Sequence, residues 1–231
     1  MKKAVCAMLL LMLCVSCGAA EGFSAKTAYE ARMKALDLFT VCALSSEYPG
    51  EGSEQGHLVR WESSIRVYID GSPTRKDRRM IDSFLLQLAL QVPDMPNITL
   101  AESRSDANLF IYFGPLDQLK NHVPDYVSGN WGLFHYICSS WRIQRAYIVI
   151  ASDVTGQRER NHLIQEEIVG ALGLPNDHTV YSDSILYQEW STVQELSEID
   201  WIMLNMVYSP LVRPGMQQQE LVGIFTEAWT R

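Results

Sequence analysis

The feature that most constrains the fold is a continuous apolar run, AYIVIA, at residues 146–151. A run without polar alternation is typical of a strand that is buried on both faces of a sheet. Two other strands are expected nearby: residues 65–69 alternate and end at Asp70-Gly71, and residues 134–137 are a further short strand. The chain is therefore predicted to contain a sheet in which 146–151 is a central strand.

Helical patterns lie on both sides of these strands. Residues 25–44 are good helix formers without Gly or Pro, and residues 76–92 carry apolar side chains at helical spacing. Asn161 is a candidate N-cap for a helix that ends at Leu172, and Ser197 for a helix that ends at Tyr208. The predicted order in the main body is strand, long helix, several strands, helix, loop, helix.

The remaining segments are short strands and loops. Gly and Pro mark residues 45–57 as a linker, and residues 115–135 are expected to be loop with one helical turn. Further short strands are predicted at 97–100 and 108–113.

Composition excludes several classes of protein. The 231 residues are 47% apolar and 20% charged, which is ordinary for a globular protein and unlike disordered, collagen-like or coiled-coil chains. The net charge is −8, from 19 Lys and Arg against 27 Asp and Glu, and it becomes −10 without Lys2 and Lys3. A chain this acidic is poorly suited to nucleic acid, which requires clustered basic side chains.

The N-terminus has the pattern of an export signal. Lys2 and Lys3 precede an apolar stretch at 4–15, which is too short to span a bilayer. Ser16-Cys17 resembles the lipobox of bacterial lipoproteins, although Cys14 replaces the usual Leu, and lipid would be attached to the Cys17 sulfur. The alternative is ordinary cleavage after Ala20. We expect an exported, membrane-anchored protein of the cell envelope, or a soluble periplasmic or secreted one.

This pattern predicts a three-part organisation. Residues 1–20 are the signal peptide, with the mature lipoprotein starting at 17, residues 21–58 form a helix and a linker, and residues 59–231 form the main domain. Once the signal and Cys17 are set aside, Cys42 and Cys138 remain. They are predicted either to form a disulfide, as exported cysteines often do, or to stay as buried thiols.

The stretch His162 to Asp177 carries the most chemical information. Its spacing follows the HExxH helix of zinc hydrolases, which places two His four residues apart and a general-base Glu beside the first. Glu167 takes the general-base position, but Glu166 and Gly170 stand where the two His would be. Extended versions of this frame continue to a glycine and then to a third metal ligand three residues later. Gly173 matches that glycine, and Asn176 takes the third ligand position.

The alternative interpretation of this stretch is structural. Ile164, Ile168 and Leu172 share one face of the helix, and His162 and Glu166 lie on the opposite side. Such a pattern is also typical of a core helix whose carboxylates are solvated. Gly170 has no ligand atom and Asn176 is a weak neutral ligand, so zinc is not expected as a cofactor and no metal site is predicted.

Several motifs together resemble one family of exported bacterial proteins. They are Glu166-Glu167-x-x-x-Ala171-Leu172-Gly173-Leu174-Pro175-Asn176-Asp177, Asp183-Ser184-Ile185-Leu186-Tyr187, Glu198-Ile199-Asp200, Tyr208-Ser209-Pro210-Leu211 and Arg213-Pro214-Gly215-Met216. On these residues the chain resembles the domain of unknown function 2927 family (DUF2927). The resemblance is specific over 160–216 and looser back to about 59. The family usually has Gln where this chain has Gly170.

The order of elements is also similar to that of metzincin metallopeptidases. Those enzymes have a strand, a long helix, a mixed sheet, an active-site helix, a turn beneath the metal and a final helix. The resemblance implies an α+β, zincin-like fold in which 184–187 forms that turn, with Leu186 in place of Met, and Ile199 to Tyr208 forms the final helix. The implied cleft would be lined by His162, Glu166, Gly170, Asn176, Asp177 and Tyr187.

Two functions remain open at this point. The first is a degenerate metallopeptidase that acts as a binding or structural module and holds an envelope peptide, glycan or protein against an edge strand. The second is an active hydrolase in which Glu167 is the general base. Glu166 and Asp177, with His162 or His178, would then hold a harder ion than zinc.

Overall fold

The computed structural model describes residues 17–45 and 56–230, with side chains from residue 27 onward. Most of the predicted signal, residues 1–16, and most of the predicted linker lie outside the described residues. No helix within the described ranges is both long enough and apolar enough to cross a membrane. The elements in chain order are α1 (Cys17–Leu44), β1 (Arg60–Trp61), β2 (Ile65–Gly71), α2 (Arg75–Gln91), β3 (Ile98–Leu100), η1 (Arg104–Asp106), β4 (Leu109–Gly114), η2 (Leu116–Asn121), β5 (Gly132–Ser139), β6 (Arg142–Ala151), α3 (Gln157–Ala171), α4 (Glu198–Tyr208) and α5 (Gln218–Thr230).

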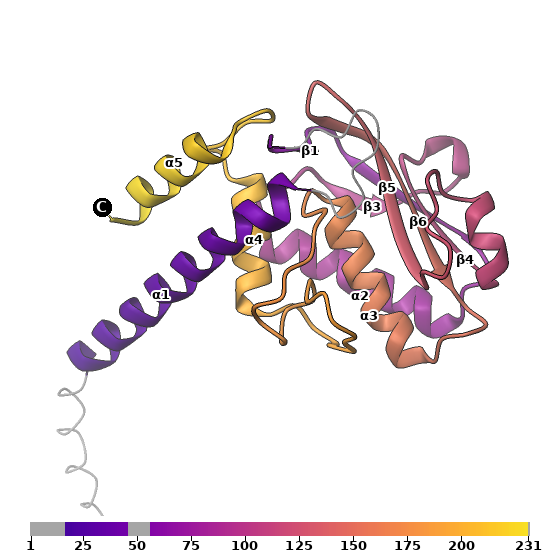
Figure 1. The fold of residues 1–231 in the computed structure, drawn as a ribbon, viewed down its shortest axis with the longest axis horizontal. Coiled ribbons are helices and arrows are strands. Elements are labelled where there is room, and N and C mark those ends of the chain that lie inside the picture. The colour runs from indigo at the N-terminus through magenta and orange to yellow at the C-terminus, as the bar shows by residue number, and fades with distance from the viewer. Residues whose placement is uncertain (1–16, 46–55, 231) are drawn as a thin grey trace, which may run out of the picture.

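One mixed sheet organises the molecule (Figure 1). The strand order is β1-β6-β4-β2-β3, with every one of these neighbours parallel, and β5 pairs antiparallel with β6. The apolar run 146–151 pairs with β4 along its length, and β5 covers its other side. The prediction of a central strand is confirmed, and the fold is a mixed α+β one with several helices.

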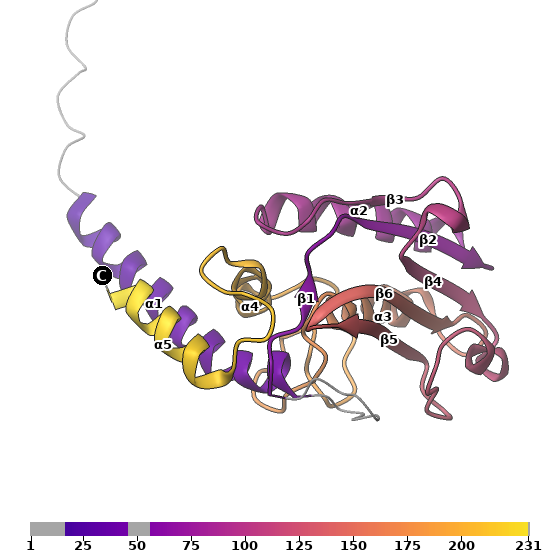
Figure 2. The ribbon, with the colours of Figure 1, turned by 90° about the horizontal axis from the view of Figure 1, so that it is seen from above.

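The two faces of the sheet are covered differently. Helices α2 and α3 lie side by side on one face, with α3 against β5 and β6 (Figures 1 and 2). On the other face η2 and the loop after it pack Leu119 and Val123 against Leu133 and Val149. Helix α3 is therefore placed directly beneath the β5 edge of the sheet.

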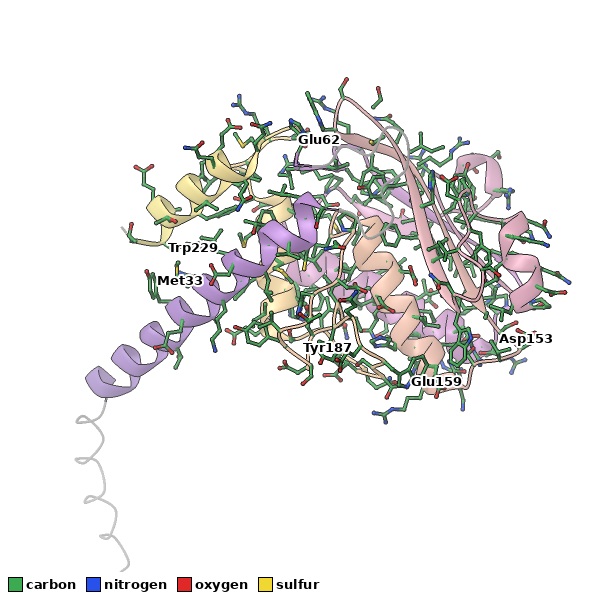
Figure 3. The ribbon with its side chains drawn as sticks, in the orientation of Figure 1. Met33, Glu62, Asp153, Glu159, Tyr187 and Trp229 are labelled. Carbon is green, nitrogen blue, oxygen red and sulfur yellow. The ribbon has the colours of Figure 1, made fainter. Side chains whose placement is uncertain are left out.

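The terminal helices form a separate layer. The C-terminal half of α1 is buried against α4 and α5, and Phe39 of α1 meets Phe225 of α5 edge to face at 5.9 Å. From that point α1 and α5 run side by side away from the sheet, with Met33 and Trp229 along the shared stretch (Figures 2 and 3). Helix α1 thus belongs to the main core through its second half.

Most predicted elements occur where the patterns placed them, with longer boundaries. The helix over 76–92 is α2, and Thr74 caps it through a reciprocal capping box with Asp77. Ser197 caps α4 in the same way with Asp200, which confirms that N-cap prediction. Strand β5 starts two residues before the predicted 134–137 stretch, and β6 starts four residues before 146.

Two helix predictions were wrong. Asn161 does not cap α3, because the helix begins at Gln157 after Gly156 and Asn161 lies inside it. The first turn is polar and gave no apolar signal, and of its residues only Arg160 is buried. The helix ending at Tyr208 is also not the final one, because α5 follows over Gln218–Thr230.

Candidate functional site

Helix α3, which carries the predicted site, is buried on nearly all sides. His162, Gln165 and Glu167 are only 5%, 1% and 7% exposed. The side chain of Glu166 is 21% exposed. The polar line of the helix therefore faces protein, and the expectation of solvated carboxylates fits only Glu166.

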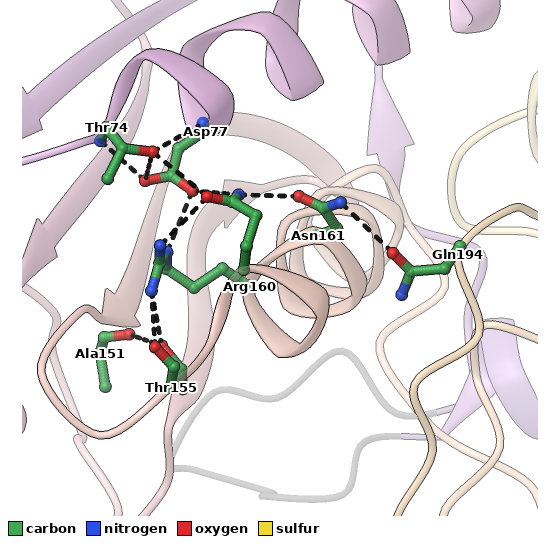
Figure 4. A network of polar contacts seen from close by, with 8 residues as sticks. Thr74, Asp77, Ala151, Thr155, Arg160, Asn161 and Gln194 are labelled. Atoms are coloured by element: carbon green, nitrogen blue, oxygen red, sulfur yellow. Dashed lines mark hydrogen bonds and ion pairs between the residues drawn. The ribbon is translucent and has the colours of Figure 1, made fainter.

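A buried ion pair fixes the first turn of α3 (Figure 4). Arg160 donates from Nε to Asp77 Oδ1 at 3.0 Å, and these two side chains are 9% and 1% exposed. Gln157 donates to the same oxygen at 2.7 Å, while Thr74 donates its backbone N–H and its hydroxyl to Oδ2, both at 2.8 Å. One carboxylate thus links α2 to the start of the site helix.

The same network reaches the sheet and the loop before α4. Arg160 Nη1 donates to Thr155 O at 2.6 Å, and Thr155 donates to Ala151 O at the end of β6. On the other side Asn161 donates to Gln194 at 3.3 Å. Burial raises the pKa of Asp77, but the hydrogen bonds from Thr74, Gln157 and Arg160 outweigh it and leave the pKa below its usual value.

Glu167 lies between α3 and strand β5. A Cβ added to Gly132 of β5 would collide with Glu167 Oε1 and would stand 2.9 Å from Leu163. A larger residue at 132 would therefore require the side chains of Glu167 and Leu163 to move. The candidate general base is held against the backbone of β5, not on an open helix surface.

The second ligand position of the zinc frame is filled by an aromatic ring. A Cβ at Gly170 would contact Phe134 Cε1 and would lie 2.7 Å from Cδ1 and 2.8 Å from Cζ of that ring. Distances this short are not found for real Cβ atoms, so a side chain at 170 requires Phe134 to move. The residues 163, 167 and 170 are consequently the line of α3 that faces β5.

His162 and Glu166 form the neighbouring line of α3. His162 Nε2 lies 3.5 Å from Glu166 Oε2, and its Nδ1 lies 2.9 Å from Val193 O in the loop before α4. Burial lowers the pKa of His162, which the contact with Val193 O only partly offsets. His162 therefore links α3 to the loop before α4 through its contact with Val193 O.

The turn at 184–187 is tied to α4. Asp200, which is fully buried, accepts from Ser184 Oγ at 2.5 Å and from the Ile185 N–H at 3.0 Å. Ser184 Oγ also accepts the Leu186 N–H at 3.1 Å. The sequence indicated Ser197 as the cap of α4, but nothing in it indicated that Asp200 also holds the turn.

His178 is enclosed beside this turn. It is 4% exposed, its Nδ1 accepts the Val180 N–H at 3.1 Å, and its Nε2 has no hydrogen-bond partner among the described residues. The rings of Tyr181 and Tyr187 lie edge-on, with centroids 6.1 and 6.5 Å away. Burial lowers the pKa of His178, against the opposing effect of Asp200 and Asp183.

The third ligand position serves to attach α1. Asn176 Nδ2 donates to Ser45 Oγ at 2.9 Å, and the Asn176 N–H donates to Cys42 O at 3.2 Å. The next residue, Asp177, is partly buried. No disulfide joins the described residues Cys42 and Cys138, of which Cys42 is buried.

Tyr187 lies on the loop that follows α3 (Figure 3), and its hydroxyl donates to Glu189 at 3.1 Å. The same loop presents Trp190, which is 68% exposed and meets Trp131 edge to face at 5.1 Å. Trp131 immediately precedes β5. The pair therefore marks the N-terminal end of that strand, and no sequence pattern singled it out.

The predicted residues are not assembled into a metal site. Within residues 27–45 and 56–230, no three His, Cys, Asp or Glu side chains lie close enough together to hold a metal ion. The predicted set instead divides into four places: the β5 side of α3, the line of α3 that faces the loop before α4, the attachment of α1, and the turn tied to α4. A cavity of about 360 Å³ lies elsewhere, between β1, the start of β2 and the loop before β3, and contains none of these residues.

Comparison with known proteins agrees with the sequence motifs. The sequence profile of a family described as a protein of unknown function, DUF2927, matches residues 33–227. The match includes the second half of α1 and the linker, which the motifs alone did not cover. No curated protein matches the chain. Because the match spans most of the chain, this protein belongs to the DUF2927 family.

Proposed function

We propose that this protein is an exported, lipid-anchored, zincin-like binding module of the cell envelope. In this proposal the site helix no longer supports metal-dependent hydrolysis, and the edge of β5 holds an extended peptide or glycan. Anchoring through Cys17 follows from the sequence pattern of the N-terminus. The other parts are supported by the layout of the fold, by the ligand positions and by the character of β5.

The layout supports a zincin-like ancestry. A strand (β2), a long helix (α2), a mixed sheet, the site helix α3, a turn at 184–187 and helix α4 follow one another in the order that metzincins show. Fold analogy alone does not carry an activity, so the chemistry rests on the side chains.

The residues present do not fit a catalytic zinc ion. Such an ion needs three protein ligands with N, S or O donors. Glu166 could supply one, but Gly170 has no donor and lies under Phe134, and Asn176 offers only a neutral amide whose Nδ2 donates to Ser45 beside α1. The filled second position is the observation that most supports a degenerate site.

Strand β5 has the properties of a binding edge. It is eight residues long, GLFHYICS. It contains no Lys, Arg, Asp, Glu or Pro, the residues that usually prevent an exposed edge strand from pairing with another chain. Trp131 O accepts the Ala151 N–H, so in this register residues 131 and 133 bond to β6. The N–H and C=O groups of Gly132 and Phe134 are directed outward, where no described strand pairs with them. The opposite edge, β3, has only three residues.

Glu167→Gln separates the binding module from the alternative hydrolase. The substitution keeps the shape and removes the charge. If Glu167 is structural, a buried carboxylate with polar partners is lost, and we expect about 1 to 3 kcal/mol of destabilisation in a thermal or denaturant melt. A broad peptidase screen should then find no activity in either protein.

The opposite pattern would support the hydrolase. There, Glu167→Gln leaves the melting temperature nearly unchanged and removes an activity that the wild type shows. Glu102→Gln, a substitution of an exposed residue beyond β3, is the matched control and should change neither measurement.

A further inference from the structure

The negative charge of this protein is concentrated in one segment. Residues 161–212 contain no Lys or Arg and eight carboxylates: Glu166, Glu167, Asp177, Asp183, Glu189, Glu195, Glu198 and Asp200. Subtracting these from 27 leaves 19 acidic residues against 19 basic ones in the rest of the chain. The whole excess of −8 therefore lies in α3, α4 and the loop between them.

This acidic segment borders the edge of β5. Glu167 abuts Gly132, and Gly170 lies under Phe134, so α3 runs along the strand. The loop carrying Glu189 and Trp190 returns over α3, where Val193 meets His162. Of the eight carboxylates, only Glu167 and Asp200 are buried; the others are exposed or half-exposed.

Exposed aromatic surface lies at the start of β5, and a half-exposed carboxylate lies on the line of α3 next to the one that faces this strand. Glu166 is adjacent to Glu167 in sequence and shares the line of α3 that His162 occupies. Trp190, beside Trp131, presents most of its ring to solvent. Each of these groups suits an ammonium or guanidinium group, the carboxylate through an ion pair and the exposed indole through a cation–π contact.

We propose that the occupant of the β5 edge is a basic polypeptide segment in extended conformation. Its backbone pairs with Gly132 and Phe134, and a Lys or Arg side chain on every second residue meets the acidic segment. This inference rests on the proposed function, and it selects a cationic peptide over a neutral or anionic ligand. The charge difference also steers association, so binding weakens with salt.

The test uses the full chain and synthetic peptides of about eight residues, a typical strand length. Three fluorescent peptides alternate Thr with Lys, Gln or Glu, and binding is measured by anisotropy at low and high salt. We expect the Lys peptide to bind roughly tenfold or more tightly than the Gln peptide at low ionic strength, and the Glu peptide to bind weakest. Salt should remove most of the difference.

N-methylation of the Lys peptide tests the backbone pairing separately. In a paired strand, only every second N–H group points toward the neighbouring strand. Because the Lys side chains of the peptide must face the acidic segment, they determine which set of its N–H groups points toward β5. Methylation of one alternate set should abolish binding, and methylation of the other should be tolerated. If both methylated peptides bind like the parent, pairing with the edge is refuted, and the proposed function fails with it.

Variants of the protein test which side chains cause the preference for the Lys peptide. Glu166→Gln, Glu189→Gln and Trp190→Ala should each weaken the Lys peptide roughly two- to fivefold, with little effect on the Gln peptide. Glu102→Gln beyond the opposite edge is the control and should have no effect. Equal binding of all three peptides, together with a clear N-methylation effect, would overturn the basic-ligand inference while leaving the edge intact. Binding of none of them would overturn both.

Discussion

The Asp77–Arg160 pair gives the sharpest stability prediction. Asp77→Asn keeps the volume of the side chain but replaces one carboxylate oxygen with an NH₂ group that faces donors. Four hydrogen bonds from Thr74, Gln157 and Arg160 converge on the carboxylate at 2.7–3.0 Å, and Asp77 is fully buried. The substitution therefore weakens the cap of α2 and leaves the buried guanidinium of Arg160 uncompensated.

The expected cost is about 3 to 5 kcal/mol, as for one partner lost from a buried ion pair. For a chain of this size it corresponds to a lower melting temperature by roughly 6 to 20 °C. Asp82→Asn, on the exposed side of the same helix, is the matched control and should change stability by less than about 0.5 kcal/mol. Denaturant melts of the three proteins at neutral pH measure these differences.

The pH dependence follows from the lowered pKa of Asp77 in the folded protein. A carboxylate with a lowered pKa contributes its full stabilisation above the unfolded-state pKa of about 3.9, and loses it as pH falls toward the folded-state pKa. The wild type and Asp77→Asn should therefore differ most above about pH 5 and converge in acid. A difference below about 1 kcal/mol at neutral pH, or one that grows in acid, would refute the reasoning.

Two further predictions concern lipid attachment at Cys17 and the zinc content of the purified protein. Metabolic labelling with a radioactive fatty acid should tag the protein and Cys17→Ala should lose the tag, whereas a soluble wild type that begins at Glu21 would contradict lipidation. Elemental analysis after purification without chelator should find no stoichiometric zinc, because Gly170 and Asn176 offer no suitable ligands; one tightly bound equivalent would contradict the degenerate site.

The spacing of apolar residues and the helix and strand propensities were enough to locate most of the helices and strands. The run 146–151 is the centre of the sheet, and the helix over 76–92 occurs almost residue for residue. Both have strong local signals, one from continuous apolar character and the other from apolar spacing. Helix α5 was missed although Leu221, Phe225 and Trp229 stand at helical spacing, so the sequence did carry a signal for it. In the structure Phe225 packs against Phe39 of α1.

The contacts of the site could not be predicted, because they join distant parts of the chain. Arg160 and Asp77 are 83 positions apart, and no local pattern links them. The absence of a side chain at Gly170 was visible, but only the structure places Phe134 against it. Sequence spacing gave the candidate residues, and tertiary packing assigns them to α1, β5 and α4.

The most direct test of the binding account is amide hydrogen exchange along β5, measured by NMR with and without the alternating Lys-Thr peptide. Without peptide, Leu133 and His135 should exchange slowly because their N–H groups bond to β6, and Gly132 and Phe134 should exchange fast. Saturating peptide should slow Gly132 and Phe134 markedly and leave Leu133 and His135 nearly unchanged. Bound peptide that leaves the exchange of Gly132 and Phe134 unaltered would contradict the claim that this edge is the binding site.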